Sequence, residues 1–386
     1  MYDSIIIGSG LAGSVVAREL AEKANHNVLI IEKRNHLGGN CFDKVDDQGI
    51  LIHPYGPHIF HTHNKAVFDY LSKFTQWHLF NHQVVASVAH KLIPVPFNLN
   101  SLYQVYPEEL ANRMKEKLIN DYGMGSKIPI LTLNRNKDSE IRQLAKDVYQ
   151  LIYLGYTQKQ WGLTPEEVDS SVTGRVPVHI SYDNSYFQDP YQGVPKQGYT
   201  KMLEQILDHP NIEIQFEVDA RELLSIKNQQ VFFSGEAFMG NIIYTAPIDE
   251  LLDYRHGHLP YRSLDFCFEH HNVPDYQGYG VVNYTMSEAF TRITEFKHLT
   301  GQVALNTTIV KEYPCAYLDD QRQLPYYPIL TDQNRAIYKK YQTDISDVNK
   351  FYLLGRLAEY QYFNMDVIVE RALNLSQSMI EEAKRK

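Results

Sequence analysis

The N-terminal part of the chain contains two short apolar runs that flank a longer segment of mixed character. The first run is Ser4–Ile7 and the second is Val28–Ile31, and between them apolar residues recur every three to four positions. Short β-branched runs are typical of buried strands, whereas the longer period is typical of an amphipathic helix. The pattern therefore predicts a strand, a helix and a second strand, which is the repeating unit of α/β folds.

A helical period dominates the second quarter of the chain. Residues 101–160 carry it, with a helix start at Pro107 and a long amphipathic stretch over residues 140–154. Gly155 is expected to end that stretch, because glycine commonly terminates helices. A closing amphipathic helix is predicted for residues 365–384. We interpret residues 101–160 as a helical insertion.

Other regions read as strands. Residues 84–97 alternate between apolar and polar positions, and the strands there are expected to end at Pro94 and Pro96, because proline cannot donate to a sheet ladder. Residues 351–356 read as a buried strand that runs into a turn. Between residues 172 and 330 the chain is rich in Tyr, Val and Pro, which predicts an antiparallel sheet. Its expected strands include residues 231–233, 242–244 and 264–268.

Length and charge narrow the class of protein. The chain has 386 residues, a formal net charge of -9 and 44% hydrophobic residues, which predicts a soluble protein of two or three domains. An acidic chain is not attracted to nucleic acid or to an anionic membrane surface, and no apolar run approaches a membrane span. The cysteines Cys41, Cys267 and Cys315 form no paired spacing, so we expect neither a disulfide framework nor a zinc site. A reducing cytoplasm fits best.

Three glycines follow the first predicted strand in the order Gly-x-Gly-x-x-Gly. Gly8 allows a tight turn, Gly10 lets the backbone approach a pyrophosphate, and Gly13 brings helix and strand together. Glu32 ends the second strand, where a carboxylate can bind ribose hydroxyls. This arrangement predicts a dinucleotide-binding unit.

A second glycine pair decides which dinucleotide is expected. Gly38 and Gly39 lie shortly after Glu32, an extension that plain NAD enzymes rarely carry and that resembles the second fingerprint of flavoproteins. FAD is therefore favoured over NAD. The predicted fold is α/β, with three parts. These are a discontinuous Rossmann-like FAD-binding domain (residues 1–80, 196–250 and 335–386), an inserted helical domain (98–165) and an antiparallel β-sheet domain (81–97, 166–195 and 251–334).

Arginine and tyrosine supply candidate chemistry for an anionic ligand. Arg175, Arg292 and Arg356 stand among small or apolar residues, where a guanidinium is costly to bury unless it is paired. A diphosphate would be a suitable bidentate partner, although structural pairs with carboxylates are equally common. Tyrosine is frequent, with 28 residues, and Tyr156 and Trp161 offer stacking faces for a base and a sugar.

Four histidines crowd one short stretch. His53, His58, His61 and His63 surround a Pro-Gly-Pro segment, but no carboxylate or thiol completes a ligand set there. We therefore expect a polar turn that faces the flavin, and no metal. No Gly-x-Ser-x-Gly elbow is present, so hydrolase chemistry has no support.

Four motifs together resemble the prokaryotic UDP-galactopyranose mutases, nearly end to end. They are Tyr-Gly-Pro-His-Ile-Phe-His-Thr (residues 55–62), Gly-Tyr-Thr-x-Lys-Gln-Trp (155–161), Tyr-Tyr-Pro (326–328) and Gly-Arg-Leu-Ala-Glu-Tyr (355–360). The resemblance implies an isomerase that interconverts the pyranose and furanose forms of a nucleotide-linked sugar, by attack of N5 of reduced FAD on the anomeric carbon. It also implies a cleft between the domains, a homodimer and an external reductant such as NAD(P)H or a reductase.

The resemblance also implies roles for individual residues. The catalytic set is Arg175, Arg292 and His61, the two arginines being diphosphate ligands and His61 lying by the flavin face. The substrate-binding set is Asn81, Tyr156, Trp161, Arg175, Tyr186, Asn283, Arg292, Tyr327 and Tyr362. The cofactor-binding set is Gly8, Gly10, Ala12, Gly13, Glu32, Lys33, Gly38, Gly39, Asn40, His58, Ile59, Gly355, Arg356, Tyr362, Phe363, Asn364, Met365, Asp366 and Val367.

The chain departs from the family pattern at a few positions. Asn364 stands where an acid is usual, and Gly174 and His179 stand where the mobile loop usually carries a basic residue. UDP-galactopyranose is the expected substrate, with dTDP-fucopyranose or UDP-N-acetylgalactosamine as alternatives. Two alternative functions remain. One is a flavin oxidase or dehydrogenase with the same domains, and the other is a nucleotide-sugar sensor without catalytic activity.

Overall fold

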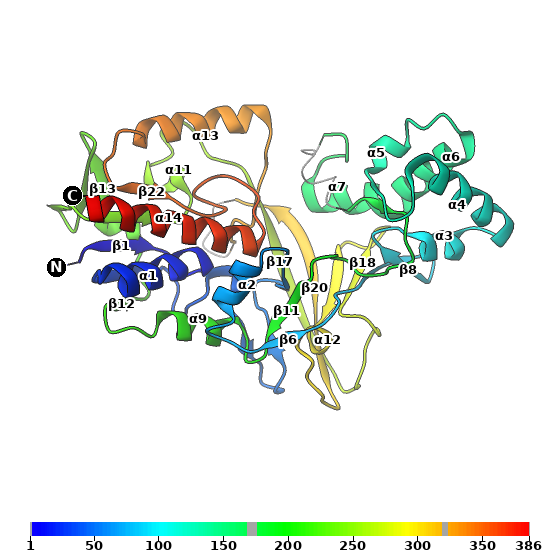
Figure 1. The fold of residues 1–386 in the computed structure, drawn as a ribbon, viewed down its shortest axis with the longest axis horizontal. Coiled ribbons are helices and arrows are strands. Elements are labelled where there is room, and N and C mark those ends of the chain that lie inside the picture. The colour runs from blue at the N-terminus through cyan, green and yellow to red at the C-terminus, as the bar shows by residue number, and fades with distance from the viewer. Residues whose placement is uncertain (1, 168–175, 319–322, 386) are drawn as a thin grey trace.

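The computed structural model describes residues 2–167, 176–318 and 323–385. A five-stranded sheet forms the part that contains both chain ends (Figure 1). Every neighbouring pair in it is parallel, and its strands come from distant parts of the sequence. The fold is therefore α/β, as predicted. The strand order is β12 (Ile212–Gln215), β2 (Val28–Ile31), β1 (Ser4–Ile7), β16 (Asn241–Tyr244) and β22 (Phe351–Leu353).

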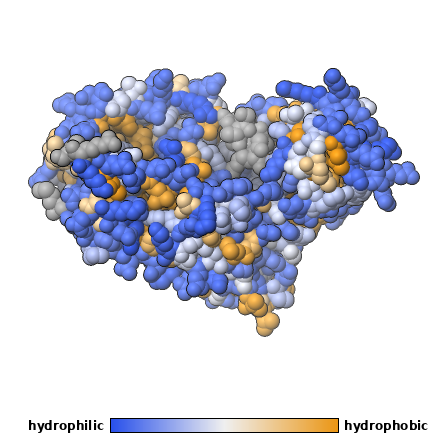
Figure 2. Space-filling model, viewed as in Figure 1, coloured by the Kyte–Doolittle hydropathy of each residue, from blue (hydrophilic) through white to orange (hydrophobic). Residues whose placement is uncertain are grey.

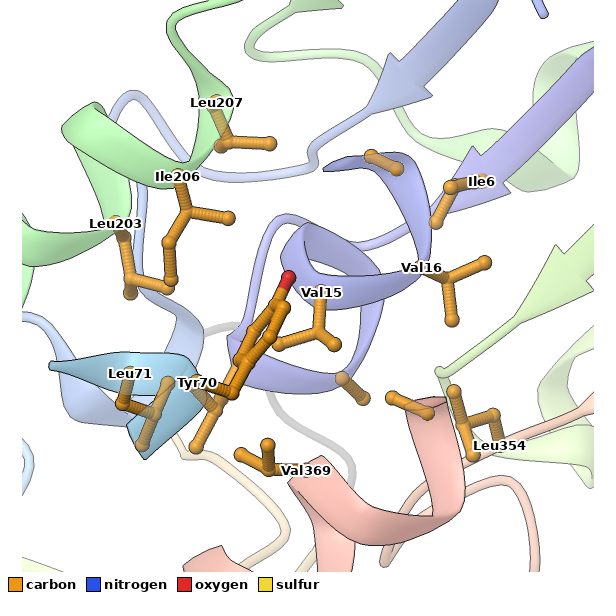
Figure 3. Packing of buried hydrophobic residues seen from close by; sticks show 14 of the residues in the cluster. Ile6, Val15, Val16, Tyr70, Leu71, Leu203, Ile206, Leu207, Leu354 and Val369 are labelled. Carbon is orange, nitrogen blue, oxygen red and sulfur yellow. The ribbon is translucent and has the colours of Figure 1, made fainter. Parts of the chain in front are cut away.

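Both faces of the parallel sheet are covered, which explains its continuous apolar strands. In β1, Ile6 points into one core, whereas Ile5 and Ile7 point into the other. Figure 3 shows the first core, where helices pack beside Ile6. The helices on that side are α1 (Leu11–Ala24), α2 (Lys65–Leu71), α9 (Tyr199–Leu207) and α14 (Met365–Arg385), the last as predicted. The second core is built with α10 (Ala220–Leu223), α11 (Ile248–Leu251), α13 (Asp332–Ile345) and the antiparallel strands β13 (Leu224–Lys227) and β14 (Gln230–Phe233). The exposed strand β15 (Glu236–Ala237) pairs with β14.

A seven-stranded sheet lies between this part and the helical part (Figure 1). Its pairs are antiparallel, except that β18 and β7 are parallel. The order is β21 (Tyr327–Pro328), β17 (Tyr261–His271), β20 (Thr307–Ala316), β19 (Arg292–Glu295), β18 (Val281–Tyr284), β7 (Val84–Val88) and β8 (Lys91–Val95).

Two strand predictions are wrong in detail. The strand expected to end at Pro94 continues to Val95, because β8 is the edge of its sheet and an edge strand tolerates a missing N–H. Residues 242–244, assigned above to an antiparallel sheet, lie in the parallel one. All three are buried, the pattern of a strand covered on both faces rather than of one with a wet face.

The helical part has a hydrophobic core of its own. It contains α3 (Leu99–Val105), α4 (Glu108–Tyr122), α5 (Ile130–Leu133), α6 (Ser139–Val148) and α7 (Gly155–Trp161), and the helix start at Pro107 is confirmed by α4. A π-helical segment, η2 (Tyr149–Leu154), joins α6 to α7.

The expected helix end at Gly155 is wrong. Gly155 is helical and begins α7, and the helix stops instead at Gly162, whose φ is +69°. A Cβ on Gly155 would lie 2.1 Å from the carbonyl oxygen of Thr285. Glycine is therefore needed here for close approach of the helix to the strand segment after β18, rather than for a left-handed turn.

The remaining elements are short. A three-stranded antiparallel sheet has the order β5 (Phe60–Thr62), β11 (Tyr191–Pro195), β6 (Trp77–Leu79). The others are β3 (Lys44–Val45), β4 (Leu51–Ile52), β9 (Lys127–Ile128), β10 (Val178–His179), η1 (Gly39–Cys41) and α12 (Phe296–Thr300). Across the described ranges, no helix combines the length and the apolar character needed to cross a membrane. The face shown in Figure 2 is mostly hydrophilic.

Candidate active site

Two glycines of the first motif, Gly8 and Gly13, are required by close contacts at the start of α1. Gly8 has φ +101°, and a Cβ there would lie 2.3 Å from Oγ1 of Thr245. A Cβ on Gly13 would lie 2.1 Å from the carbonyl oxygen of Gly8. Gly10 precedes α1 as its N-cap, so the open end of the helix is presented at this turn. Such a turn can accept a pyrophosphate on backbone N–H groups.

The second glycine pair packs against the first motif. Gly38 forms an isolated bridge with Gly10 and donates its N–H to the carbonyl of Ser9 at 3.1 Å. A Cβ on Gly39 would lie 3.1 Å from Cα of Gly10. Gly355 approaches the same place, since a Cβ there would lie 3.8 Å from that of Ala12. Four predicted cofactor glycines thus share one crowded backbone surface.

Glu32 is buried and held in place beside this surface. Its Oε2 accepts hydrogen bonds from the N–H and the hydroxyl of Ser9, at 2.9 and 2.7 Å, and its Oε1 accepts the N–H of Arg34 at 2.9 Å. A carboxylate has further lone pairs, so it can also accept ribose hydroxyls. Asn40 accepts from the guanidinium of Arg34 at 2.9 Å, whereas Lys33 is exposed and pairs with Asp219 at 3.1 Å.

The closing turn supplies one polar atom that has no partner. Oδ1 of Asp366, in the first turn of α14, is buried and makes no hydrogen bond to any described residue. Arg356 is held by the carbonyls of Tyr326 and Phe363, at 3.2 and 3.0 Å. Val367 follows Asp366 in the same helical turn. A buried acceptor without a partner indicates a ligand with a donor at this position.

A cavity of about 290 Å³ lies where the sheets, α7 and the closing turn meet. Its lining joins residues from the four motifs that the sequence singled out. Of the predicted site residues, those that line it are His58, Ile59, His61, Tyr156, Trp161, Tyr186, Asn283, Arg292, Tyr327, Arg356, Tyr362, Asn364 and Met365.

A polar row crosses the sheet at the cavity wall. Asn283, Arg292 and Glu312 are cross-strand neighbours on β18, β19 and β20. Arg292 donates to the hydroxyl of Tyr156, which α7 brings over the sheet, and its Nε lies 3.4 Å from Oε2 of Glu312. Burial opposes the charge of Arg292, but the carboxylate of Glu312 and the nearby phenols raise its pKa well above the usual value. Arg292 therefore stays a cation.

This row is only partly satisfied. Nε of Arg292, Oε1 of Glu312, Oδ1 of Asn283 and Oε1 of Gln160 are all buried, and none makes a hydrogen bond to a described residue. Buried polar atoms nearly always have partners, so the cavity is built for a ligand that carries both donors and acceptors.

Aromatic rings form another wall of the cavity. Tyr327 and Tyr362 stack with centroids 5.9 Å apart, and Trp161 lies 5.7 Å from Tyr327. The guanidinium of Arg356 lies 4.8 Å from the centre of the Tyr362 ring and 5.4 Å from that of Tyr327. Flat faces beside cations suit a base, a sugar and a phosphate.

Two histidines around the Pro-Gly-Pro segment, His53 and His58, are removed from solvent and neutral. His58 donates from Nδ1 to the carbonyl of Gly56 at 2.8 Å, and its backbone N–H donates to Nδ1 of His53 at 3.0 Å. Burial lowers the pKa of His53 to about 4 and that of His58 to about 3. His61 instead lies 3.0 Å from the carboxylate of Asp189.

These two buried histidines predict an acid-sensitive fold. Their pKa values in the folded protein lie below the ordinary 6.5, so the unfolded chain binds more protons as the pH falls through 6.5 toward 4. The free energy of unfolding should therefore drop in that window, by about 1.4 kcal/mol per pH unit for each histidine. Urea titrations along the window measure it, and His58→Gln should flatten the slope. If the pH dependence of the unfolding free energy were unchanged in that variant, His58 would not be a source of the acid sensitivity.

Arg175 and Gly174 lie outside the described residues. Of the described residues that were predicted, several do not line the cavity. Asn81 is exposed and does not line the cavity, whereas its neighbour His82 does. His179 is buried in β10. Phe363, Asp366 and Val367 belong to the closing turn but not to the lining.

Sequence reasoning missed the residues that fix α7 on the sheet. Lys159 donates from Nζ to the carbonyls of Tyr284, Glu288 and Phe290, at 2.6, 3.0 and 3.1 Å. Arg262, on β17, donates to the carbonyls of Gln160 and Lys159 at 2.8 and 3.0 Å. Lys159 lies within the motif of residues 155–161, so its importance could have been predicted from the sequence. No sequence pattern marks Arg262 or Glu312.

Comparison with known proteins shows which family the chain resembles. The model of the UDP-galactopyranose mutase family matches residues 151–362, and that of an NAD(P)-binding Rossmann-like domain matches residues 6–74. The dTDP-fucopyranose mutase of Escherichia coli is 34% identical over all of both chains. The UDP-galactopyranose mutase of Mycoplasma pneumoniae is also 34% identical, covering 98% of this chain and 96% of its own.

Solved structures share the fold over nearly the whole chain. A crystal structure of reduced UDP-galactopyranose mutase superposes with a TM-score of 0.74 at 17% identity, covering 100% of this chain and 95% of the other. A redesigned putrescine oxidase superposes with a TM-score of 0.61 at 12% identity, covering 99% of each. At such identities the likeness concerns the fold alone.

Proposed function

The chain belongs to the UDP-galactopyranose mutase family, and on that premise we propose that it is an isomerase that interconverts the pyranose and furanose forms of a nucleotide-linked sugar. UDP-galactopyranose is the favoured substrate. The observation that carries the proposal is the charged, partly buried Arg292 at the wall of a cavity where several buried polar atoms make no hydrogen bond to a described residue. The Arg292 guanidinium suits a diphosphate, and the acceptor atoms suit hydroxyl and N–H donors of the sugar and the nucleoside that this diphosphate joins.

We propose FAD as the cofactor. The two glycine motifs form a surface on which side chains would clash, and the buried Oδ1 of Asp366 lacks a donor among the described residues. Both features fit an FAD pyrophosphate and its neighbouring groups. Glu32 would hold the ribose, while His58, Ile59 and the closing turn would border the flavin. When bound in its reduced form, FAD supplies the nucleophile toward the anomeric carbon, which explains why no side-chain nucleophile is needed.

The chain's own residues then have three tasks. Arg292, together with Arg175, neutralises the diphosphate as it leaves the sugar and as it returns. Trp161, Tyr327 and Tyr362 orient the sugar and keep water away from it. Tyr156 and Asn283 hold the nucleoside, and Glu312 fixes Arg292 from behind.

Two other nucleotide sugars are alternatives to UDP-galactopyranose. Relatives that act on UDP-galactopyranose and on dTDP-fucopyranose are equally similar to this chain. UDP-N-acetylgalactosamine is a third candidate. An oxidase or dehydrogenase role, suggested by the fold of putrescine oxidase, would gain nothing from an arginine placed to bind a diphosphate.

Product analysis tests the function directly. Reduced, FAD-loaded protein is incubated in parallel with the three nucleotide sugars, with oxidised protein as the control, and the products are identified by NMR. A furanose formed from one of them, only with reduced flavin, is the expected result. Flavin that is oxidised or reduced in step with substrate, without any furanose, would refute the proposal.

Asn364→Asp is expected to weaken binding of UDP about threefold to tenfold. Asn364 lines the cavity, and a new carboxylate would repel the diphosphate by about 1 kcal/mol in a partly wet site. Calorimetric titration with UDP measures the change, with Asn364→Ala as the uncharged control. Tighter binding by the Asp variant would show that Asn364 does not face the diphosphate.

We further propose a cytoplasmic homodimer that serves polysaccharide biosynthesis by forming galactofuranose donors. An external reductant, NAD(P)H or a reductase, would keep FAD reduced, because the reaction itself consumes no electrons. The three-domain division given above is part of the same proposal, and the separate core of α3 to α7 supports it.

A further inference from the structure

We propose that Asp189 is a positioning residue for His61, which it holds in one orientation and one tautomer at the wall of the cavity. Asp189 belongs to none of the four motifs and was not among the expected site residues. The inference deepens the proposed function and rests on it, because His61 is expected to lie beside the cofactor.

The His61 ring is fixed from two directions. It lies on β5, opposite Gln192 of β11, and it is half-buried with 14% of its side chain exposed. Its Nδ1 lies 3.0 Å from Oδ2 of Asp189. Its face stacks on Phe187 with centroids 3.6 Å apart and an interplanar angle of 12°. Both His61 and Phe187 line the cavity.

Asp189 is in turn held by its own neighbours. Gln192 donates from Nε2 to the carbonyls of Asp189 and Phe187, at 3.1 and 3.4 Å. Oδ1 of Asp189 lies 2.5 Å from Nδ1 of His63. The carboxylate is 15% exposed, whereas His63 is 73% exposed. One buried acid thus serves a cavity histidine and a surface histidine with separate oxygens.

The Asp189 carboxylate determines which ring nitrogen of His61 carries the proton. A carboxylate can only accept, so Nδ1 of His61 carries a proton, and Nε2 is the nitrogen through which His61 can act on a ligand. A carboxylate on Nδ1 also stabilises the protonated ring. His61 can then donate from Nε2 to an anion or to a sugar oxygen, and Asp189 need not touch either.

Other charged groups near His61 do not replace Asp189. His63, beyond the end of β5, shares the carboxylate. His82 precedes β7 and stays neutral, since burial, Arg292 and His61 together lower its pKa to about 3. Arg292 is a cation, and Tyr186 packs against Phe187 and His82. Of the charged and titratable groups named around His61, Asp189 is therefore the one that carries a negative charge.

The test is Asp189→Asn in oxidised, FAD-loaded protein, read by the ring ¹⁵N shifts of His61 along a pH titration. The amide keeps the shape and removes the charge, so the titration midpoint of His61 should fall by about one pH unit or more. His63→Gln is the matched control, because it alters the other partner of the same carboxylate. It should move the midpoint by less than half as much.

The same shifts in the unsubstituted protein give a second measurement that needs no variant. Neutral His61 should carry its proton on Nδ1, and a proton on Nε2 instead would overturn the proposal. An unchanged midpoint in folded Asp189→Asn would overturn it as well. Neither measurement uses a sugar nucleotide, so they stand even if product analysis refutes the proposed function. In reduced protein, the pH dependence of turnover should shift in the direction of the midpoint.

Discussion

Arg292→Ala is expected to lower turnover by about 10²–10³-fold while FAD remains bound, as for the loss of one charge-stabilising donor in other active sites. Arg292 is the cation in the row of polar residues on β18, β19 and β20. Glu312 and Tyr156 hold its guanidinium at the cavity wall. Without it, the charge that develops on the departing diphosphate has lost its buried partner. The glycine motifs lie on other elements, so the cofactor should be retained.

The experiment must separate lost chemistry from lost stability. Glu312 is buried, and burial already raises its pKa, so removing Arg292 leaves an unpaired acid that costs about 3–5 kcal/mol. The double variant Arg292→Ala/Glu312→Gln removes that acid as well. It should regain much of the Tm but none of the turnover. Turnover near that of the unsubstituted enzyme in either variant would refute the role of Arg292.

A net charge of -9 does not conflict with an anionic substrate. The described arginines that line the cavity are held by defined partners: Arg292 by Glu312 and Tyr156, and Arg356 by two carbonyls and two rings. A partly buried guanidinium acts strongly at short range, whereas the charge of the distant surface is screened. Under the proposed function, the net negative charge would disfavour polyanions without preventing these arginines from binding one diphosphate.

The cofactor end of the site was predictable because its determinants are local. Gly8, Gly10 and Gly13 lie within one turn, and the structure gives Gly8 and Gly13 close contacts that require glycine. The wall of the cavity that carries Arg292 was predictable only in part. Arg292 stood in a recognisable context, but its partner Glu312 is set by strand register between β19 and β20. Register depends on tertiary pairing, which a single sequence does not display.

Gly155 shows another reason why a prediction failed, and His82 shows how the neighbour of a predicted residue can line the cavity. The rule that glycine ends helices holds for Gly162. Glycine is needed at position 155 for a different reason, because the carbonyl oxygen of Thr285, distant in sequence, leaves no room for a Cβ. His82, rather than the expected Asn81, lines the cavity. Adjacent residues of an extended chain point to opposite sides, so an offset of one position reverses the assignment.

Gly155→Ala is expected to destabilise the fold by about 1–3 kcal/mol and to lower turnover at least tenfold, through overpacking at one point. The new Cβ would lie 2.1 Å from the carbonyl oxygen of Thr285, so α7 must move away from the sheet. Since α7 carries Tyr156, that movement separates the phenol from Arg292. Urea titration and steady-state turnover measure the two effects.

Gln158→Ala is the matched control, because Gln158 is exposed on the same helix and alanine there adds no contact. It should leave both quantities near their original values. Alanine is a better helix former than glycine, so a purely local view expects Gly155→Ala to stabilise α7 by about 1 kcal/mol. The sign of the change therefore decides whether helix propensity or the approach of α7 to Thr285 governs this position, and stabilisation with full turnover would refute the packing argument.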